Sequence, residues 1–155
     1  MITLKKGDKA PDFSGYDQDG NRLSLKSFYG KKVVLYFYPK DNTPGCTAEA
    51  CNLRDNYSML LDKGYAIIGV SADSPKSHKN FIAKYDLPFP LIADTDITIC
   101  RIYGVWGPKK FMGRTFDGIN RTTFLISEEG VIEAVITKVK TGDHTMQILN
   151  ELNNK

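Results

Sequence analysis

The sequence lacks any apolar run long enough to cross a bilayer. Its longest run, Val33–Tyr38, falls far short of the roughly 20 residues that a membrane span needs. Residues 1–8 lack the apolar stretch of a secretory signal, so we expect a cytoplasmic protein. Repeats, low-complexity tracts and linkers are also absent, and we expect one domain over residues 1–155. The hydrophobic content of 41% excludes a wholly disordered chain.

Neither sign of charge dominates the sequence. Lys and Arg number 21 against 18 Asp and Glu, which leaves a net charge of +3. The densest basic stretch contains Lys109, Lys110 and Arg114, with Asp117 close by. We interpret it as a solvated face rather than a nucleic-acid site, so no nucleic-acid partner is expected.

Cysteine is scarce, with only Cys46, Cys51 and Cys100. An odd number in a chain without an export signal excludes a disulfide scaffold. Zinc sites usually combine two closely spaced ligand pairs, whereas Cys46 and Cys51 have no second pair, so we expect no metal and no cofactor. Stoichiometric zinc would instead favour a metal-binding module. His78 and His144 lie in polar segments and are predicted to be surface residues.

The hydrophobic pattern predicts strands that alternate with helices. Continuous apolar, β-branched runs are typical of strands buried on both faces; they occur at 33–38, 65–70 and 91–93. Helical spacing predicts helices at 47–63, from 75 onwards, at 96–103 and around 146–152. Turn residues predict hairpins with tips at 17–20 and 127–130. Together these elements predict an α/β fold, a central mixed β-sheet flanked by helices.

The segment that carries chemistry follows the first buried strand. Pro39 ends that strand, and Cys46 falls in the first turn of the next helix. Free backbone N–H groups and the positive end of the helix dipole favour a thiolate there over a thiol. Thr43 can aim its hydroxyl at the sulfur or at a bound oxygen, while Pro39 and Pro44 stiffen the loop. This context predicts a reactive cysteine rather than one that packs as a small hydrophobe.

At these residues the sequence resembles the peroxiredoxins. Pro39, Thr43 and Cys46 fit the family signature P-x-x-x-T-x-x-C. Further matches are found at Ala10–Phe13, Tyr103–Gly107 and Gly118–Ile126. With two cysteines five residues apart in one helix, the sequence resembles the subgroup called bacterioferritin comigratory protein, or peroxiredoxin Q. The resemblance extends from Gly7 to the last helix.

The resemblance implies a thioredoxin-like fold with an N-terminal β-hairpin extension. It implies a thiol peroxidase that reduces hydrogen peroxide and organic hydroperoxides in antioxidant defence. Cys46 would be the peroxidatic cysteine and Cys51 the resolving one, with Arg121, Thr43 and Pro39 completing the site. Thioredoxin would be the usual reductant, glutaredoxin an alternative, and the protein a monomer.

Several alternatives remain open on the sequence alone. Glu49 is either simply a carboxylate of the kind that a helix N-terminus favours, or it orients Arg121. Cys100 lies in an apolar stretch and is expected to pack as a small hydrophobe rather than to resolve the sulfenic acid. A redox sensor on the same fold would react once with peroxide, whereas a peroxidase turns over.

The spacing of the two cysteines constrains a disulfide between them. In an intact helix, residues five apart have Cα atoms about 8.6 Å apart. A disulfide needs roughly 4.4–6.8 Å. If Cys46 and Cys51 pair as the resemblance implies, the helix must unwind by a turn or more.

Overall fold

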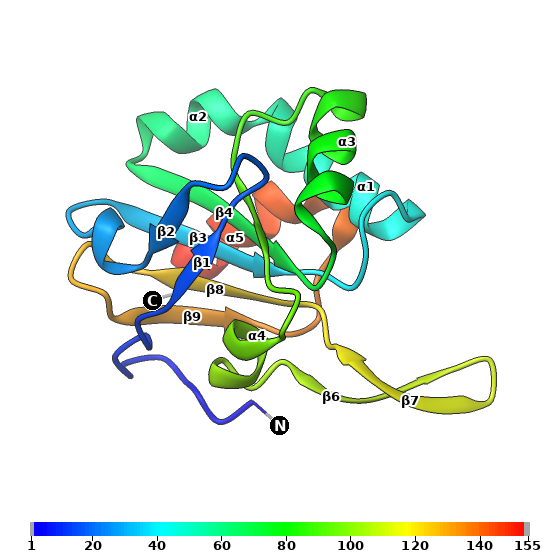
Figure 1. Ribbon diagram of the computed structural model, residues 1–155. Coiled ribbons are helices and arrows are strands. Elements are labelled where there is room, and N and C mark those ends of the chain that lie inside the picture. The colour runs from blue at the N-terminus through cyan, green and yellow to red at the C-terminus, as the bar shows by residue number, and fades with distance from the viewer. Residues whose placement is uncertain (1, 154–155) are drawn as a thin grey trace.

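The central sheet holds the molecule together, and its labels follow Figure 1. The computed structural model describes residues 2–153. Within them, the sheet has the strand order β5-β4-β3-β8-β9. β4 runs parallel to both β3 and β5, β8 is antiparallel to β3, and β9 is antiparallel to β8. The predicted mixed sheet is therefore confirmed, with bounds β3 Lys32–Phe37, β4 Tyr65–Ser71, β5 Leu91–Ala93, β8 Thr122–Ile126 and β9 Ile132–Ile136.

Helices cover the two faces of the sheet unequally (Figure 1). One face packs against the four helices α1, α2, α3 and α5, and the other against the short helix α4 and the N-terminal segment. The bounds are α1 Pro44–Asp55, α2 Tyr57–Asp62, α3 Pro75–Tyr85, α4 Thr98–Ile102 and α5 His144–Asn153. Within residues 2–153, no helix is both long and apolar enough to cross a membrane.

Strand β3 supplies both halves of the core. Val34 and Tyr36 pack in the cluster under the four helices, while Leu35 and Phe37 pack in the cluster on the opposite face. This alternation follows from the two-residue period of side chains along a strand. Every side chain of β3 after Lys32 is buried, as the continuous apolar run predicts. The strand is thus fixed on both faces up to the point where the loop before α1 begins.

The N-terminal segment forms the predicted hairpin. Strands β1 (Ser14–Tyr16) and β2 (Arg22–Ser24) pair antiparallel and are followed by the 3-10 helix η1 (Lys26–Phe28). Asp17 holds the tip, because its Oδ1 accepts the N–H groups of Asp19 and Asn21, both at 2.9 Å. The segment is tied to the core where the Tyr103 hydroxyl donates to the Pro11 carbonyl at 2.6 Å.

Two features of the chain differ from the sequence-based prediction. The helix expected over 47–63 starts earlier, at Pro44, and is broken at Asn56 into α1 and α2. Asn56 has non-helical backbone angles, and its side-chain amide donates to the carbonyl of Asn52 at 2.8 Å. Asparagine side chains compete in this way with the helical hydrogen bonds of the backbone.

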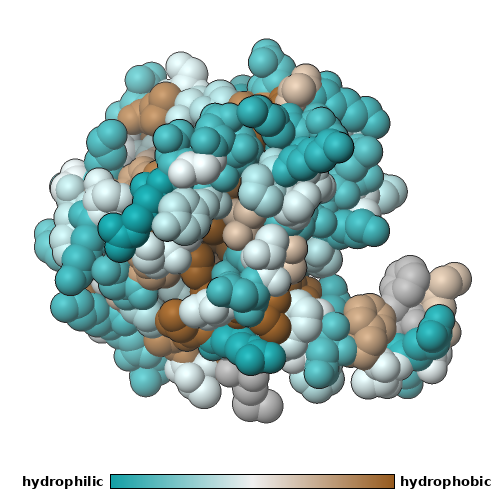
Figure 2. Space-filling model, in the orientation of Figure 1, coloured by the Kyte–Doolittle hydropathy of each residue, from teal (hydrophilic) through white to brown (hydrophobic). Residues whose placement is uncertain are grey.

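The second difference is a hairpin that the hydrophobic pattern did not indicate. Strands β6 (Trp106–Phe111) and β7 (Arg114–Ile119) pair antiparallel and project from the body, at the right of Figures 1 and 2. Lys110, Arg114 and Asp117 on it are exposed, whereas Lys109 is half-buried. A projecting ribbon buries few side chains, so its sequence shows no clear apolar alternation. A further 3-10 helix, η2 (Thr141–Asp143), precedes α5.

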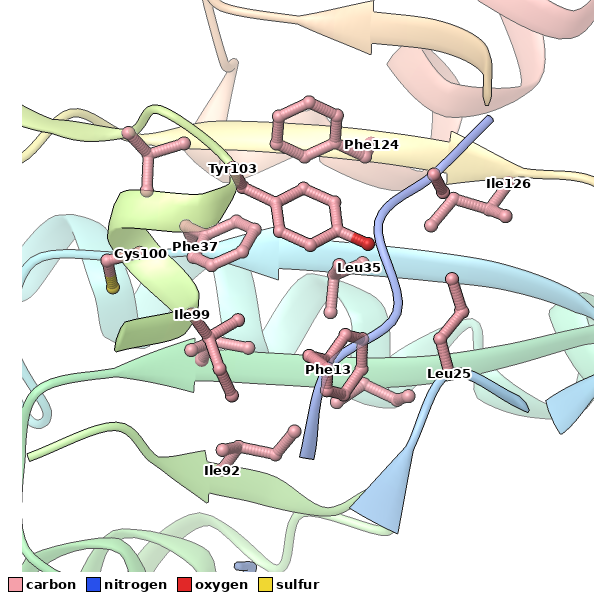
Figure 3. Packing of buried hydrophobic residues seen from close by; sticks show 14 of the residues in the cluster. Phe13, Leu25, Leu35, Phe37, Ile92, Ile99, Cys100, Tyr103, Phe124 and Ile126 are labelled. Atoms are coloured by element: carbon pink, nitrogen blue, oxygen red, sulfur yellow. The ribbon is translucent and has the colours of Figure 1, made fainter. Parts of the chain in front are cut away.

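Phe124 on β8 offers a test of the packing on the α4 face (Figure 3). Its ring is fully buried and lies 5.8 Å from the ring of Phe37 and 5.0 Å from that of Tyr103. Phe124→Ala is expected to lower the free energy of unfolding by about 3–5 kcal/mol, measured by denaturant titration. The control Met112→Ala removes an 86% exposed side chain and should change it by about 0.5 kcal/mol or less. Equal effects of the two substitutions would contradict this packing.

Candidate active site

Cys46 lies in the first turn of α1, as predicted. Thr43 is the N-cap residue and Pro44 the first helical residue, which suits a side chain with a fixed φ and no N–H. The first backbone bond of the helix runs from the N–H of Thr47 to the carbonyl of Thr43 at 2.8 Å. Cys46 is only 2% exposed, and all three cysteines are free thiols. The N-terminal end of the helix therefore surrounds a nearly buried sulfur.

Arg121 reaches this sulfur from the segment just before β8. Its Nη2 donates to Cys46 Sγ at 3.2 Å, and its Nη1 donates to Glu49 Oε1 at 2.7 Å. Burial works against the charge of Arg121, but the charges of Cys46 and Glu49 more than offset it, so the pKa of the guanidinium is raised. The structure thus brings together Cys46 and Arg121, 75 positions apart, and Glu49 orients the arginine.

Gly45 makes this approach possible. A Cβ at Gly45 would lie only 3.2 Å from Arg121 Nη2, closer than side chains normally allow. No local sequence signal shows that a distant arginine passes over Gly45. A Cβ here would require the guanidinium to shift by a few tenths of an ångström.

A second cation faces the site from the projecting hairpin. Lys109 on β6 is half-buried, and its pKa is lowered, first by burial and then by the charge of Arg121, while Cys46 acts in the opposite direction. The sequence analysis assigned Lys109 to a solvated face. Its position beside Arg121 depends on the hairpin, which the sequence did not reveal.

The loop before α1 is anchored by Asp41. Its carboxylate accepts hydrogen bonds from the Tyr38 hydroxyl at 2.6 Å and the Ser77 hydroxyl at 2.8 Å, and its Oδ2 lies 2.7 Å from His78 Nδ1. The Asp41 N–H donates to Asp73 Oδ2 at 2.8 Å. These bonds tie the loop to the start of α3 and hold Cys46 in place relative to the sheet.

The prediction that both histidines are surface residues is wrong, because His78 and His144 have no exposed surface. Hydrogen bonds satisfy their polar atoms inside the protein, so a polar local sequence did not mean exposure. In the described part of the chain, Asp41, Asp73 and His78 place one ligand atom each within 4.8 Å of one another, a spacing that a metal ion can use. Hydrogen bonds among them and with Ser71 already occupy these atoms.

The remaining predicted residues lie at or near this site. Thr43 is half-buried and donates its hydroxyl hydrogen to the Lys40 carbonyl at 2.9 Å, so its proton does not point at the sulfur. Pro39 is half-buried in the same loop, and Cys51 is half-buried further along α1. Cys100 lies fully buried on the other face of the sheet, where burial and the neighbouring Asp94 raise the pKa of its thiol.

The fold and the site together define a class of protein. A thioredoxin-like mixed sheet presents a cysteine at the head of a helix, and an arginine donates to its sulfur. Charge that develops on the sulfur or on a departing oxygen would be stabilised by that arginine and by the helix N-terminus. This is the arrangement of a thiol peroxidase.

Comparisons with known proteins give the family. A model of the AhpC/TSA family matches residues 6–135. The putative peroxiredoxin Bcp of Coxiella burnetii is 50% identical over 97% of this chain and 100% of its own length. Peroxiredoxin Bcp of Escherichia coli K12 is 48% identical over 98% of this chain and 97% of its own. The chain belongs to the AhpC/TSA family, in its bacterioferritin comigratory protein (peroxiredoxin Q) subgroup.

A solved structure of a protein from the same subgroup supports the fold. The bacterioferritin comigratory protein of Xanthomonas campestris, described for its alkyl peroxide reduction activity, matches with a TM-score of 0.85 at 38% identity. The match covers 92% of this chain and 90% of that one. Its family membership makes the protein a peroxiredoxin, an oxidoreductase that reduces peroxides with a thiol.

The contact between Arg121 and the sulfur generates a prediction. Cys46→Ser is expected to abolish peroxide reduction, and Arg121→Ala to slow it by about one hundred- to one thousand-fold, the scale for removal of one charge-stabilising donor. Stopped-flow kinetics with hydrogen peroxide measure both rates. The control Arg101→Ala removes an exposed arginine on α4 and should leave the rate unchanged. Turnover near the wild-type rate in Cys46→Ser would refute this site.

Proposed function

We propose that the protein reduces hydrogen peroxide and organic hydroperoxides through Cys46, with Cys51 as the resolving cysteine and thioredoxin as the reductant. The observation that carries the proposal is the 3.2 Å contact from Arg121 Nη2 to Cys46 Sγ at the head of α1. It supports a thiolate held beside a fixed cation, which is the nucleophile that the reaction needs.

In the first step the Cys46 thiolate attacks the nearer peroxide oxygen. The O–O bond breaks as the S–O bond forms, which leaves Cys46 as a sulfenic acid and releases hydroxide or an alkoxide that takes up a proton. Negative charge moves from sulfur to the departing oxygen. Arg121 is placed to stabilise both ends of this shift, because its guanidinium already lies on the sulfur and carries several donors.

Thr43 and Pro39 complete the proposed peroxide pocket. Because Thr43 gives its own proton to the Lys40 carbonyl, its oxygen is free to accept the O–H of the peroxide. The role we propose for Thr43 is therefore that of an acceptor which orients the substrate, rather than a donor. Pro39 has no N–H and stiffens the loop that carries Thr43.

The second step is condensation of the sulfenic acid with the Cys51 thiol, which forms the disulfide and releases water. Both cysteines lie in α1, so the disulfide requires that helix to open. Beyond Cys51 the helix is tied to the C-terminal segment. Asn52 Oδ1 accepts the N–H of Thr145 at 2.8 Å, and its amide donates to the Gly142 carbonyl at 3.3 Å. This anchor favours unwinding from the N-terminal end up to Cys51.

Reduction by thioredoxin fits a disulfide exposed by that opening, because thiol–disulfide exchange needs access to the sulfur under attack. Glutaredoxin is the alternative reductant. We further propose a monomer of one domain in the cytoplasm. Three free cysteines suit a reducing compartment, and of the exposed large hydrophobic side chains that the structure describes, only Met112 and Phe116 share one hairpin.

Single cysteine substitutions test the assignment of the two steps. Cys51→Ser is expected to react once with peroxide, at close to the wild-type rate, and then to lose turnover with thioredoxin and thioredoxin reductase. The matched control Cys100→Ala should retain turnover, because the buried Cys100 thiol is protonated and inert. Loss of turnover in a folded Cys100→Ala protein, with turnover kept in Cys51→Ser, would assign the resolving role to Cys100 instead. Turnover with glutaredoxin alone would identify that reductant.

Opening of α1 is testable by amide hydrogen exchange. Oxidised protein is expected to exchange faster than reduced protein over about residues 44–51, and its far-UV circular dichroism should show less helix. Strand β4, Tyr65–Ser71, is buried in the sheet and serves as the internal control with unchanged protection. Equal protection of α1 in both forms, with the Cys46–Cys51 bond confirmed by peptide mapping, would rule out unwinding.

A further inference from the structure

A wholly buried polar cluster adjoins Arg121 through Glu49. It joins Glu49 of α1, Thr123 of β8 and His144 of α5, none of which has exposed surface. His144 Nε2 lies 2.8 Å from the Thr123 hydroxyl and 3.4 Å from Glu49 Oε2. The peroxidase steps described above do not use this histidine.

The hydrogen bonds around Gln147 fix the tautomer of His144. The Gln147 amide donates to the Lys138 carbonyl, and its Oε1 accepts the N–H of Lys140, both at 2.8 Å. This orientation leaves an oxygen, which can only accept, 3.0 Å from His144 Nδ1. Nδ1 must therefore carry a hydrogen, and in a neutral imidazole the other nitrogen, Nε2, is bare.

A bare Nε2 accepts the hydrogen of the Thr123 hydroxyl at 2.8 Å and has none to give to Glu49 Oε2, which lies 3.4 Å away. Glu49 Oε1 accepts from Arg121. Among residues 2–153, no hydrogen-bond donor is found for Glu49 Oε2, although the atom is buried. Two acceptors that face each other in a buried site are destabilising, and one proton between them removes the conflict.

We propose that Glu49 carries a buried proton on Oε2, the oxygen that faces His144 Nε2, and that this proton keeps the Arg121 guanidinium directed at Cys46. His144 is thus a positioning residue that acts through Glu49. With the proton in place, the pair is neutral, and the single positive charge of Arg121 balances the single negative charge of the Cys46 thiolate. Without it, Glu49 becomes a second anion that competes with Cys46 for Arg121.

The charged and titratable groups packed around the pair agree with a proton on Glu49. Burial raises the pKa of Glu49 to about 7 although Arg121 opposes the shift. Burial lowers the pKa of His144 to about 4; the hydrogen bond with Gln147 opposes this shift and the charge of Arg121 adds to it. The buried Tyr36 of β3 stays a neutral phenol, because burial and then the Glu49 charge raise its pKa. The other charged groups that face Arg121 are Cys46 of α1 and Lys109 of β6.

The pH dependence follows from the higher of the two pKa values. Below about pH 7 Glu49 holds the proton, and as pH rises through about 7 it loses the proton and becomes charged. The kcat/KM for peroxide should therefore decline above about pH 7, because the charged Glu49 then draws Arg121 away from Cys46.

The first test is nuclear magnetic resonance of the reduced wild-type protein. Ring nitrogen shifts of His144 are expected to show the neutral tautomer with hydrogen on Nδ1, and the Glu49 side-chain carboxyl carbon should titrate near pH 7. A doubly protonated His144 ring at neutral pH, hydrogen on Nε2 alone, or a Glu49 carboxyl already ionised at about pH 5 would each overturn the proposal. This inference rests on the proposed role of Arg121, but the measurement needs no peroxide turnover, so the two can fail separately.

The second test uses two variants and a matched control. In His144→Gln the new amide can donate to Oε2, which should move both the Glu49 titration and the decline of kcat/KM toward acid by about one pH unit. Glu49→Gln, which is neutral at every pH, should abolish the decline whatever its absolute rate. The control His78→Gln changes the other buried histidine, which bonds Asp41, and should leave the Glu49 titration in place. An unchanged midpoint in folded His144→Gln, or an unchanged decline in Glu49→Gln, would refute the proposal.

Discussion

The rest of the site depends on the position of one guanidinium, held between the sulfur of Cys46 and the carboxyl group of Glu49. Arg121 donates to both at once, and it is only about one-fifth exposed, so its charge acts through little water. A buried cation is stable only where charged or polar partners surround it. The head of α1 supplies these partners, and the start of β8 fixes the point from which the arginine reaches them.

Around this contact the fold divides its tasks between the two ends of α1. At the N-terminal end, Asp41 ties the loop to α3, and Gly45 leaves space for the guanidinium. At the C-terminal end, Asn52 binds the segment that leads into α5. The residues between these anchors carry the chemistry, and the sheet beneath them is buried on both faces. The residues that react and the residues that anchor α1 are thus close neighbours but different side chains.

The local sequence was sufficient to predict the elements that are stabilised by local interactions or by hydrophobic burial alone. The apolar run of β3, the proline that opens α3 and the position of Cys46 in the first helical turn were all predicted correctly. The contact of Arg121 with Cys46 came from the family resemblance alone, because no local pattern reports a contact across 75 positions. The break at Asn56 was missed, since a single side-chain bond to a backbone carbonyl decides it against a continuing helical pattern. His78 and His144 were misplaced because partners distant in sequence make their burial favourable.

That break at Asn56 also sets the size of the smallest unit that can melt independently. If the segment from Pro44 to Asp62 formed one continuous helix, unwinding of its first turns would disturb a helix that packs along the sheet over its whole length. Divided in two, the segment gives α2 its own core contact through Leu60, separate from those of α1. The unit that unfolds cooperatively is then a few turns of α1 rather than the whole helical layer over the sheet. Oxidation of one sulfur can therefore cause local unfolding while the rest of the domain stays native.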